Sequence, residues 1–526
     1  MNTLATRWNT ILRRQLGIGR RHDVDLAFWL LMACACLFMA WIARLHPLTH
    51  DAFHEMAMIR YWHQTGSFPH SDVFAFTPTV SPAVHHEWGM GAILYLFTFF
   101  STDPFVGIGV LKGFCLVILG LLVYRGARMS GAHPIVLAML APIIFPVIWV
   151  GFSTLRAGMF TMVAIAAQWV MQRYDLRGSR AWILAWIAFY VIWLNVHAGF
   201  VVGIAMLGCH GIERFVLTGI NKSTTHQLPR FDWMRSFSAT WHLVLLIPVI
   251  LIGACLNPWG TDYIPYLIRA ITMPRPTMLE WQPLWKTYQP EWTLVCYTGS
   301  IALAVYGFRS RRWDRCFGLL ILVLSAYMSL KHLRHGALYG VLWLMIVPSW
   351  ISSTPLGHWI LQMLHRDRQR VIWVSTFVSG ICLLMAWIPS HFQVTLPRTL
   401  AESPHCYPVD AVEHLRTTGF HGKLVTPFHA GSYVSWTLHP QVFVSVDGRY
   451  EVAYRDDVLP KHNRLYRAES GWEEVLREFR PDAILVPTTS PLLEALEHSS
   501  ITDEIGWQLE YRDQAYALFQ PATSLQ

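Results

Sequence analysis

Acidic and histidine side chains gather in one stretch of this sequence, between Leu45 and Trp88. Its members are His50, Asp51, His54, Glu55, His70, Asp72, His85, His86 and Glu87. Asp51 follows a long apolar segment within a few residues, which places its carboxylate at a membrane edge, where it can act on a substrate delivered in lipid. The alternative interpretation is a solvated polar loop without chemistry.

Cationic and amide side chains stand at the ends of other apolar segments. They are Arg156, Asn195, His197, Asn257, Lys331, His332, Arg334 and His335. In the topology derived below they lie on the outer side of the membrane, which the positive-inside rule leaves poor in Lys and Arg, so their presence calls for an anionic partner. A phosphate on a lipid carrier would serve. Arg156 and Arg334 could instead extend toward lipid headgroups.

The composition places this chain in the membrane class. Hydrophobic residues make up 53% of the 526 residues and charged residues only 14%, a balance that soluble proteins rarely show. The formal net charge of +8 comes from short clusters between apolar segments, which indicates topology signals rather than nucleic-acid binding. Of the nine cysteines only Cys406 lies away from apolar segments, so a disulfide framework in the C-terminal part is excluded.

A helix needs about 20 mostly apolar residues to cross a bilayer. On that basis we predict a polytopic α-helical membrane protein with about eleven spans. They lie near 25–45, 104–124, 132–150, 155–172, 180–195, 197–212, 241–256, 293–308, 316–331, 335–350 and 371–389. The run from Gly89 to Phe100 is too short and is predicted to lie in the interface.

This set of spans brings the basic clusters to one side, the inner side. They include Arg125, Lys222, Arg312 and Arg368. Asp51, Trp281 and the chain after Ser390 then lie on the outer side. Counting the Gly89–Phe100 run as a span would move these clusters to opposite sides, which favours the odd number.

From Val409 onward, helical patterns alternate with short β-branched runs. Helices are predicted at 411–417 and 472–479, and strands at 424–427, 442–446, 483–486, 507–511 and 516–519. This alternation is typical of a small α/β domain with a largely parallel sheet. We therefore expect a membrane domain over 1–390, with a long first outer loop at 46–88, and a soluble extracytoplasmic α/β domain over 391–526.

The motifs His50–His54, Gly66–Thr77 and His86–Trp88 resemble the first outer loop of bacterial GT-C-type glycosyltransferases, a superfamily that includes protein mannosyltransferases and aminoarabinose transferases. Later motifs extend the resemblance over most of the chain. They are Arg156 in Thr-Leu-Arg, Trp193–Gly199, Leu256–Gly260, Glu280-Trp281, Arg334-His335, Gly431–Trp436 and Val446–Arg449.

The resemblance implies that a sugar is moved, with inversion, from a polyprenyl phosphate or diphosphate to an acceptor glycan, lipid or protein on the outer face of a bacterial inner membrane, for the cell envelope. Asp51 would be the general base that takes the acceptor proton, with Asp72 and Glu87 as rivals. Cationic and imidazole groups would stabilise the departing phosphate: Arg156, His197, Lys331, Arg334 and His335. Further residues expected in the substrate region are His54, His86, Asn195, Asn257 and Glu280.

The sequence specifies no cofactor with certainty, and a divalent metal ion, Mg²⁺ or Mn²⁺, could bind Asp72 or Glu87 with His86. The alternative function is a non-catalytic membrane protein that binds or translocates lipid-linked glycans, or an envelope assembly partner. A transporter should show related halves, and none are evident. An outer-face hydrolase would need a Gly-x-Ser-x-Gly or His-Glu-x-x-His motif, and the sequence contains neither. Asp447–Arg449 is interpreted as a turn with a structural ion pair, and a role in substrate binding is the alternative.

Overall fold

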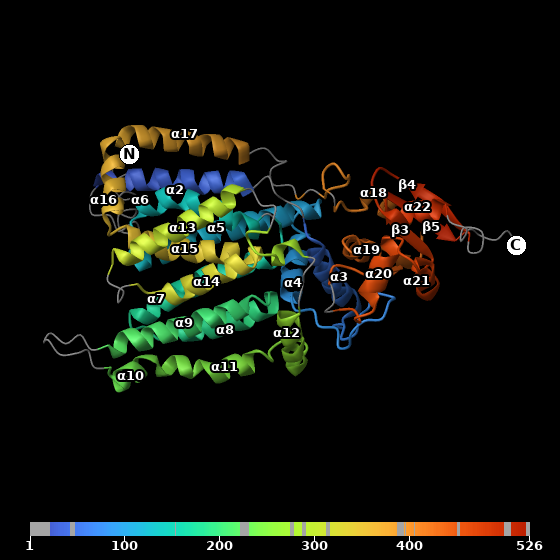
Figure 1. Ribbon diagram of the computed structural model, residues 1–526, viewed down its shortest axis with the longest axis horizontal. Coiled ribbons are helices and arrows are strands. Elements are labelled where there is room, and N and C mark those ends of the chain that lie inside the picture. Colours follow the sequence, from blue (N-terminus) through green and yellow to red (C-terminus); the bar gives the residue numbers. More distant parts are fainter. Residues whose placement is uncertain are drawn as a thin grey trace.

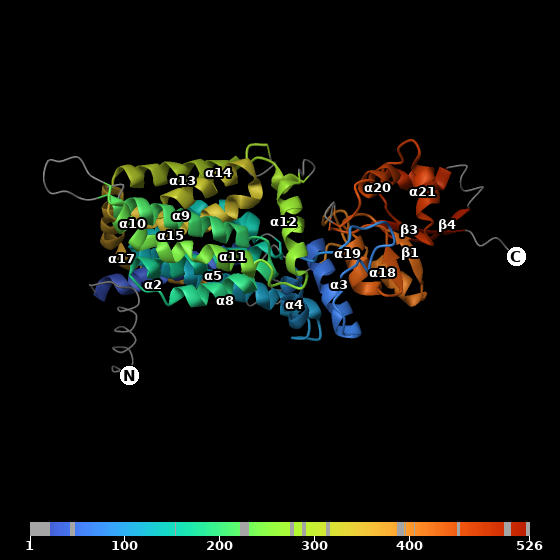
Figure 2. The same ribbon diagram turned by 90° about the horizontal axis from the view of Figure 1, so that it is seen from below.

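The computed structural model describes residues 21–42, 48–152, 154–220, 231–273, 278–286, 291–311, 316–386, 394, 396–403, 405–449, 453–498 and 506–521. Two parts follow one another along its longest axis, a bundle of long helices and a smaller α/β part (Figure 1). The helices α3 (His50–Thr65) and α4 (Trp88–Phe97) lie where the two parts meet, and the view from below shows the same arrangement (Figure 2).

The bundle is built around α15 (Gly336–Ile351), which is apolar on every side and buried over its whole length. Its other helices are α2 (Arg21–Ile42), α5 (Pro104–Ser130), α6 (Pro134–Ile148), α7 (Gly158–Leu176), α8 (Trp182–Val196), α9 (Phe200–Gly219), α10 (Trp233–Val244), α11 (Leu246–Gly253), α12 (Tyr263–Thr272), α13 (Glu291–Arg309), α14 (Leu319–Lys331), α16 (Pro355–Arg366) and α17 (Arg368–Ala386). Large apolar side chains such as Leu121, Leu251 and Phe377 are exposed on the outside of the bundle. Such a surface is suited to lipid.

Four described helical segments are long and apolar enough to cross a membrane: Val24–Ile42, Pro104–Ser130, Phe200–Gly219 and Trp233–Gly253. A fifth is formed if Leu333–Ile351 and Pro355–Arg366, which meet at 87°, count as one bent span. Shorter apolar helices accompany them, so the chain is a largely helical multi-span membrane protein. α4 has ten residues, too few to cross, as the sequence predicted. Lys222 and Arg312 lie outside the described residues.

The segment predicted as the first outer loop, 46–88, contains helix α3 over residues 50–65, which was not predicted from the sequence. The eight consecutive residues Ala52–Ile59 are all buried. They are covered by α4 and by α19 (Gly431–Leu438) of the α/β part. Because neighbours enclose the helix on several sides, its sequence shows no simple amphipathic stripe. It ends at Gly66, whose φ of 72° is readily adopted by glycine.

The α/β part contains a five-stranded sheet in the order β2-β1-β3-β5-β4. The strands are β1 (Gly422–Val425), β2 (Val442–Val444), β3 (Ala483–Pro487), β4 (Trp507–Arg512) and β5 (Tyr516–Pro521). β1 pairs in parallel with β2 and β3, whereas β5 pairs antiparallel with β3 and β4. The sheet is therefore mixed rather than largely parallel, because β4 and β5 are joined by a short turn that permits only antiparallel pairing.

Five helices accompany this sheet: α18 (Val409–Thr417), α19, α20 (Val458–Tyr466), α21 (Trp472–Phe479) and α22 (Pro491–His498). Of these, α18 and α21 coincide with the predicted helices, whereas α19, α20 and α22 were not predicted. Each of the three has only eight or nine residues, but α18 and α21 are equally short, so length does not separate the predicted helices from the missed ones.

The chain that follows α3 docks on the free edge of β2. Phe76 N donates to Val444 O at 3.0 Å, and Val444 N donates to Phe74 O at 3.0 Å. Thr77 Oγ1 donates to Ser445 O at 2.5 Å. The first outer segment and the α/β part therefore share one folded junction, and the residues of the candidate site lie at its border with the bundle.

Candidate active site at the junction of the two parts

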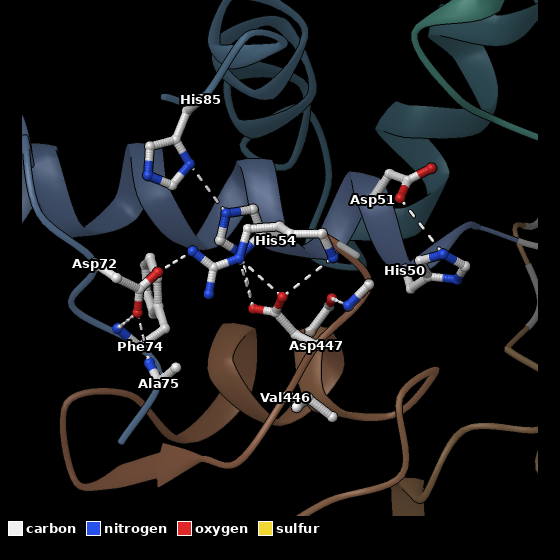
Figure 3. A network of polar contacts seen from close by, with 12 residues as sticks. His50, Asp51, His54, Asp72, Phe74, Ala75, His85, Val446 and Asp447 are labelled. Atoms are coloured by element: carbon white, nitrogen blue, oxygen red, sulfur yellow. Dashed lines mark hydrogen bonds and ion pairs between the residues drawn. The ribbon is translucent and has the colours of Figure 1, made fainter. Parts of the chain in front are cut away.

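Asp51 lies in the first turn of α3, and backbone pairing fixes its position. Leu48 forms an isolated parallel bridge with Leu155, and Thr49 Oγ1 donates to Leu155 O at 3.3 Å. This pairing brings the beginning of α3 next to Arg156. The Asp51 side chain is 40% exposed, and its Oδ1 lies 3.4 Å from His50 Nε2 (Figure 3). A substrate can therefore reach the carboxylate.

The surroundings raise the pKa of Asp51 above its ordinary value. Desolvation by the surrounding protein is the main cause. Glu87 and Glu280 add to it by repulsion, whereas His50 and Arg156 oppose it. A carboxylate with a raised pKa is a stronger proton acceptor than an ordinary aspartate.

Two arginines meet on the carboxylate of Glu280. Arg156 Nη1 forms an ion pair with Glu280 Oε2, and Arg334 Nη1 lies 3.4 Å from Glu280 Oε1. The Arg334 guanidinium also covers the Trp281 ring at 4.7 Å, and His332 Nδ1 donates to Trp281 O at 2.7 Å. Because the Glu280 carboxylate holds both guanidinium groups, Arg156 and Arg334 form a paired cationic site. An incoming phosphate would either share the two guanidinium groups with Glu280 or displace its carboxylate.

Glu87 lies between two histidines. Its Oε1 is 3.3 Å from His86 Nε2 and 3.5 Å from His197 Nε2, and Tyr266 of α12 bonds the other His86 nitrogen at 2.7 Å. Burial opposes ionisation of Glu87, but His86, His197 and Arg334 outweigh it and lower its pKa to about 2. Glu87 is therefore ionised and a weak base. Tyr266 was missed in the sequence because α12 was not predicted.

No family model and no curated protein matches the sequence. The structure is nevertheless similar to solved membrane glycosyltransferases. The structure of ArnT from Cupriavidus metallidurans bound to undecaprenyl phosphate is 12% identical with a TM-score of 0.52, and the match covers 94% of this chain and 98% of that one. The oligosaccharyltransferase of Archaeoglobus fulgidus, tethered with an acceptor peptide, matches with a TM-score of 0.56 and 12% identity over 87% of this chain and 68% of that one.

The chain has the GT-C glycosyltransferase fold. The same archaeal oligosaccharyltransferase in complex with an inhibitory peptide and a dolichol-phosphate matches with a TM-score of 0.52 at 12% identity, over 89% of this chain and 69% of that one. The resemblance that the sequence motifs indicated is thus confirmed at the level of the fold. At such identity the GT-C likeness concerns the fold alone.

Within this GT-C fold Asp72 has a structural role. Its Oδ1 accepts hydrogen bonds from Phe74 N at 2.9 Å and Ala75 N at 2.7 Å, and its Oδ2 pairs with Arg449 (Figure 3). Arg449 Nε in turn donates to both oxygens of Asp447, at 2.8 and 3.0 Å. The Asp72 side chain is only 2% exposed. The structure therefore places Asp72 in the ion pair of the Asp447–Arg449 turn and away from solvent.

Two of the predicted substrate-region residues, Asn195 and Asn257, hold turns of the GT-C bundle. Asn195 Oδ1 accepts from Trp88 Nε1 at 2.8 Å, and its Nδ2 donates to Leu256 O at 2.9 Å. Asn257 Oδ1 accepts from Trp259 N at 2.9 Å. Both side chains use their hydrogen bonds to fix the ends of helices.

The remaining predicted residues differ in position. His197 Nδ1 is bonded to Thr161 Oγ1 at 2.7 Å while its Nε2 faces Glu87. His335 Nδ1 is buried and has no hydrogen-bond partner among the residues that the structure describes. Lys331 is exposed at the end of α14 and forms no ion pair with a described residue. His54 belongs to the Asp447 network rather than to the Asp51 cluster.

Neither predicted metal position fits Mg²⁺ or Mn²⁺. Asp72 already uses its oxygens for Arg449 and two backbone amides. Glu87 supplies one carboxylate among imidazoles, whereas both ions prefer a set of oxygen ligands.

Proposed function

We propose that this chain is a membrane glycosyltransferase that moves a sugar, with inversion, from a polyprenyl phosphate or diphosphate to an acceptor hydroxyl on the outer face of a bacterial inner membrane. Asp51 acts as general base. The observation that carries the proposal is that an accessible carboxylate with a raised pKa lies near Arg156, which shares the carboxylate of Glu280 with Arg334.

Each partner in this cluster has a defined task in the reaction. Asp51 takes the hydroxyl proton as the acceptor oxygen bonds to the anomeric carbon. The bond between that carbon and the phosphate oxygen breaks, and its electron pair leaves with the lipid phosphate. Arg156 and Arg334 stabilise the charge that develops there, and they do so more strongly than water because they are held in place beforehand.

The comparisons support the class of donor. The Cupriavidus ArnT structure contains undecaprenyl phosphate, and the archaeal oligosaccharyltransferase structure contains dolichol-phosphate. Both lipids carry the anion that a pair of arginines recognises.

Donor binding provides the test. Arg156→Gln and Arg334→Gln should each weaken binding of undecaprenyl phosphate by about 10–100-fold, because each removes a charge-assisted contact of about 1.5–3 kcal/mol. Affinity would be measured by native mass spectrometry of the full chain in detergent. Arg416→Gln serves as control, since Arg416 is exposed in the α/β part and pairs only with Glu413 among the described residues.

Unchanged affinity in both variants, with thermal stability intact, would remove the arginines from the donor site. Normal donor binding combined with no transfer of sugar to any acceptor would instead favour a protein that binds or translocates lipid-linked glycans.

We also propose about eleven spans, with residues 1–390 in the membrane domain and the 391–526 domain in the periplasm. Cysteine labelling tests this topology in a cysteine-free background. Ser67→Cys and Glu510→Cys should react with a membrane-impermeant maleimide on intact cells, whereas Arg177→Cys and Arg366→Cys should react only after permeabilisation. All four positions are exposed. Protection of Glu510→Cys in intact cells would reverse the topology and the proposed site.

A further inference from the structure

A cluster of two histidines and one glutamate lies at the junction beside the Asp51 site. His54 and Glu55 come from α3, and His85 comes from the segment that leads into α4. Ligand atoms from these three residues all lie within 4.8 Å of one another. It is the only such group of three metal-binding side chains within the described part of the chain.

All three side chains are buried, with exposures of 1% for His54, 6% for Glu55 and 3% for His85. Glu55 Oε2 nevertheless has no hydrogen-bond partner among the described residues. Leaving a polar group buried and unpaired costs about 1–3 kcal/mol. Such atoms in a native structure call for a ligand that satisfies them.

We propose that His54, Glu55 and His85 bind a Zn²⁺ ion. Two imidazole nitrogens and a carboxylate oxygen are a donor set that zinc accepts. His54 Nε2 and His85 Nδ1 are 3.0 Å apart, close to the separation of about 3.3 Å that tetrahedral zinc requires with bonds of about 2.0–2.1 Å.

The groups behind His54 are those that often support a histidine that binds a metal ion. The second nitrogen of His54, Nδ1, lies 3.3 Å from Asp447 Oδ2 without forming a hydrogen bond to it (Figure 3). A carboxylate at this position behind a ligating histidine would fix its tautomer and orientation. Asp447 is itself held by Arg449.

The ion would have a structural role that does not depend on glycosyl transfer. It joins α3 to the segment before α4, and through Asp447 it reaches the turn after β2. His86 and Glu87 directly follow His85 in the sequence, so the same ion would hold these residues against His197.

The test uses the full chain purified in detergent without a polyhistidine tag. The protein is stripped with a chelator, reloaded with Zn²⁺ or Co²⁺, and analysed by inductively coupled plasma mass spectrometry and visible absorption. We expect one bound ion per chain, cobalt ligand-field bands, and metal affinity reduced by at least about tenfold in His54→Gln, Glu55→Gln and His85→Gln. His70→Gln is the matched control, since His70 is exposed in the same outer segment, and it should bind like the wild type.

Wild-type protein that retains no zinc or cobalt after reloading would overturn the proposal, and so would wild-type affinity in the three variants. If the variants do not fold, X-ray absorption of the zinc-loaded wild type decides. Two imidazole ligands support the site, and a spectrum without imidazole excludes it.

Discussion

An Asp51→Asn protein should transfer sugar about 10²–10⁴-fold more slowly than the wild type, which is the usual contribution of a general base. Asparagine keeps the volume of aspartate and can still form hydrogen bonds, but it lacks a basic oxygen. Because the phosphate of the donor is assigned to Arg156 and Arg334, donor binding should survive the change. The loss would therefore appear in kcat rather than in donor affinity.

The measurement is glycosyl transfer in nanodiscs from a lipid-linked sugar pool, with expression and thermal stability as controls for folding. Near-normal turnover of the Asp51→Asn protein would exclude Asp51 as the general base. The two rivals should behave differently. Asp72→Asn should reduce stability rather than chemistry, since Asp72 is paired with Arg449. Glu87→Gln should alter the His86 and His197 contacts without removing a strong base, since the pKa of Glu87 is lowered to about 2.

The pH profile gives an independent check on Asp51. Only the ionised carboxylate can accept a proton, so activity should rise with pH through the pKa of Asp51 and fall below it. Because desolvation by the surrounding protein raises that pKa, the acid limb should lie at higher pH than for an ordinary aspartate, and Asp51→Asn should lack it.

The second large effect concerns stability. Arg449→Met should lower the free energy of unfolding by about 3–5 kcal/mol, because it leaves the buried carboxylates of Asp72 and Asp447 without their cation. Both lie at the junction, with exposures of 2% and 0%. The change would be measured by thermal unfolding of the full chain in detergent.

Arg416→Met is the control, and it should change the unfolding temperature little because its ion pair with Glu413 is exposed. Adding Asp72→Asn and Asp447→Asn to Arg449→Met should restore part of the lost stability, since the unpaired charges are then removed. Equal unfolding temperatures for Arg449→Met and the wild type would contradict the structural role of this ion pair.

Helix α3 shows why part of the fold was missed. Its sequence is polar at both ends, and in the structure α4 and α19 bury its middle. Two features of the sequence could have indicated this helix. One is Gly66, a residue type that often ends a helix, and the other is the group of apolar residues Phe53, Met56 and Met58. A largely parallel sheet was predicted from the sequence, and that prediction missed that β5 pairs antiparallel with both of its neighbours. Strand direction depends on the pairing partners and not on the strands' own residues.

By itself the sequence determined the membrane class, the helical character of the apolar segments and the α/β pattern after Val409, because each depends on run length and local periodicity. It also supplied the acids and cations of the site. Only the tertiary structure decided which acid is available. Asp51, Asp72 and Glu87 lie in one segment, yet Asp72 is neutralised by Arg449, 377 positions further along the chain. Glu87 is held ionised by His86, His197 and Arg334. Basicity and access depend on neighbours in space, and folding alone brings those neighbours together.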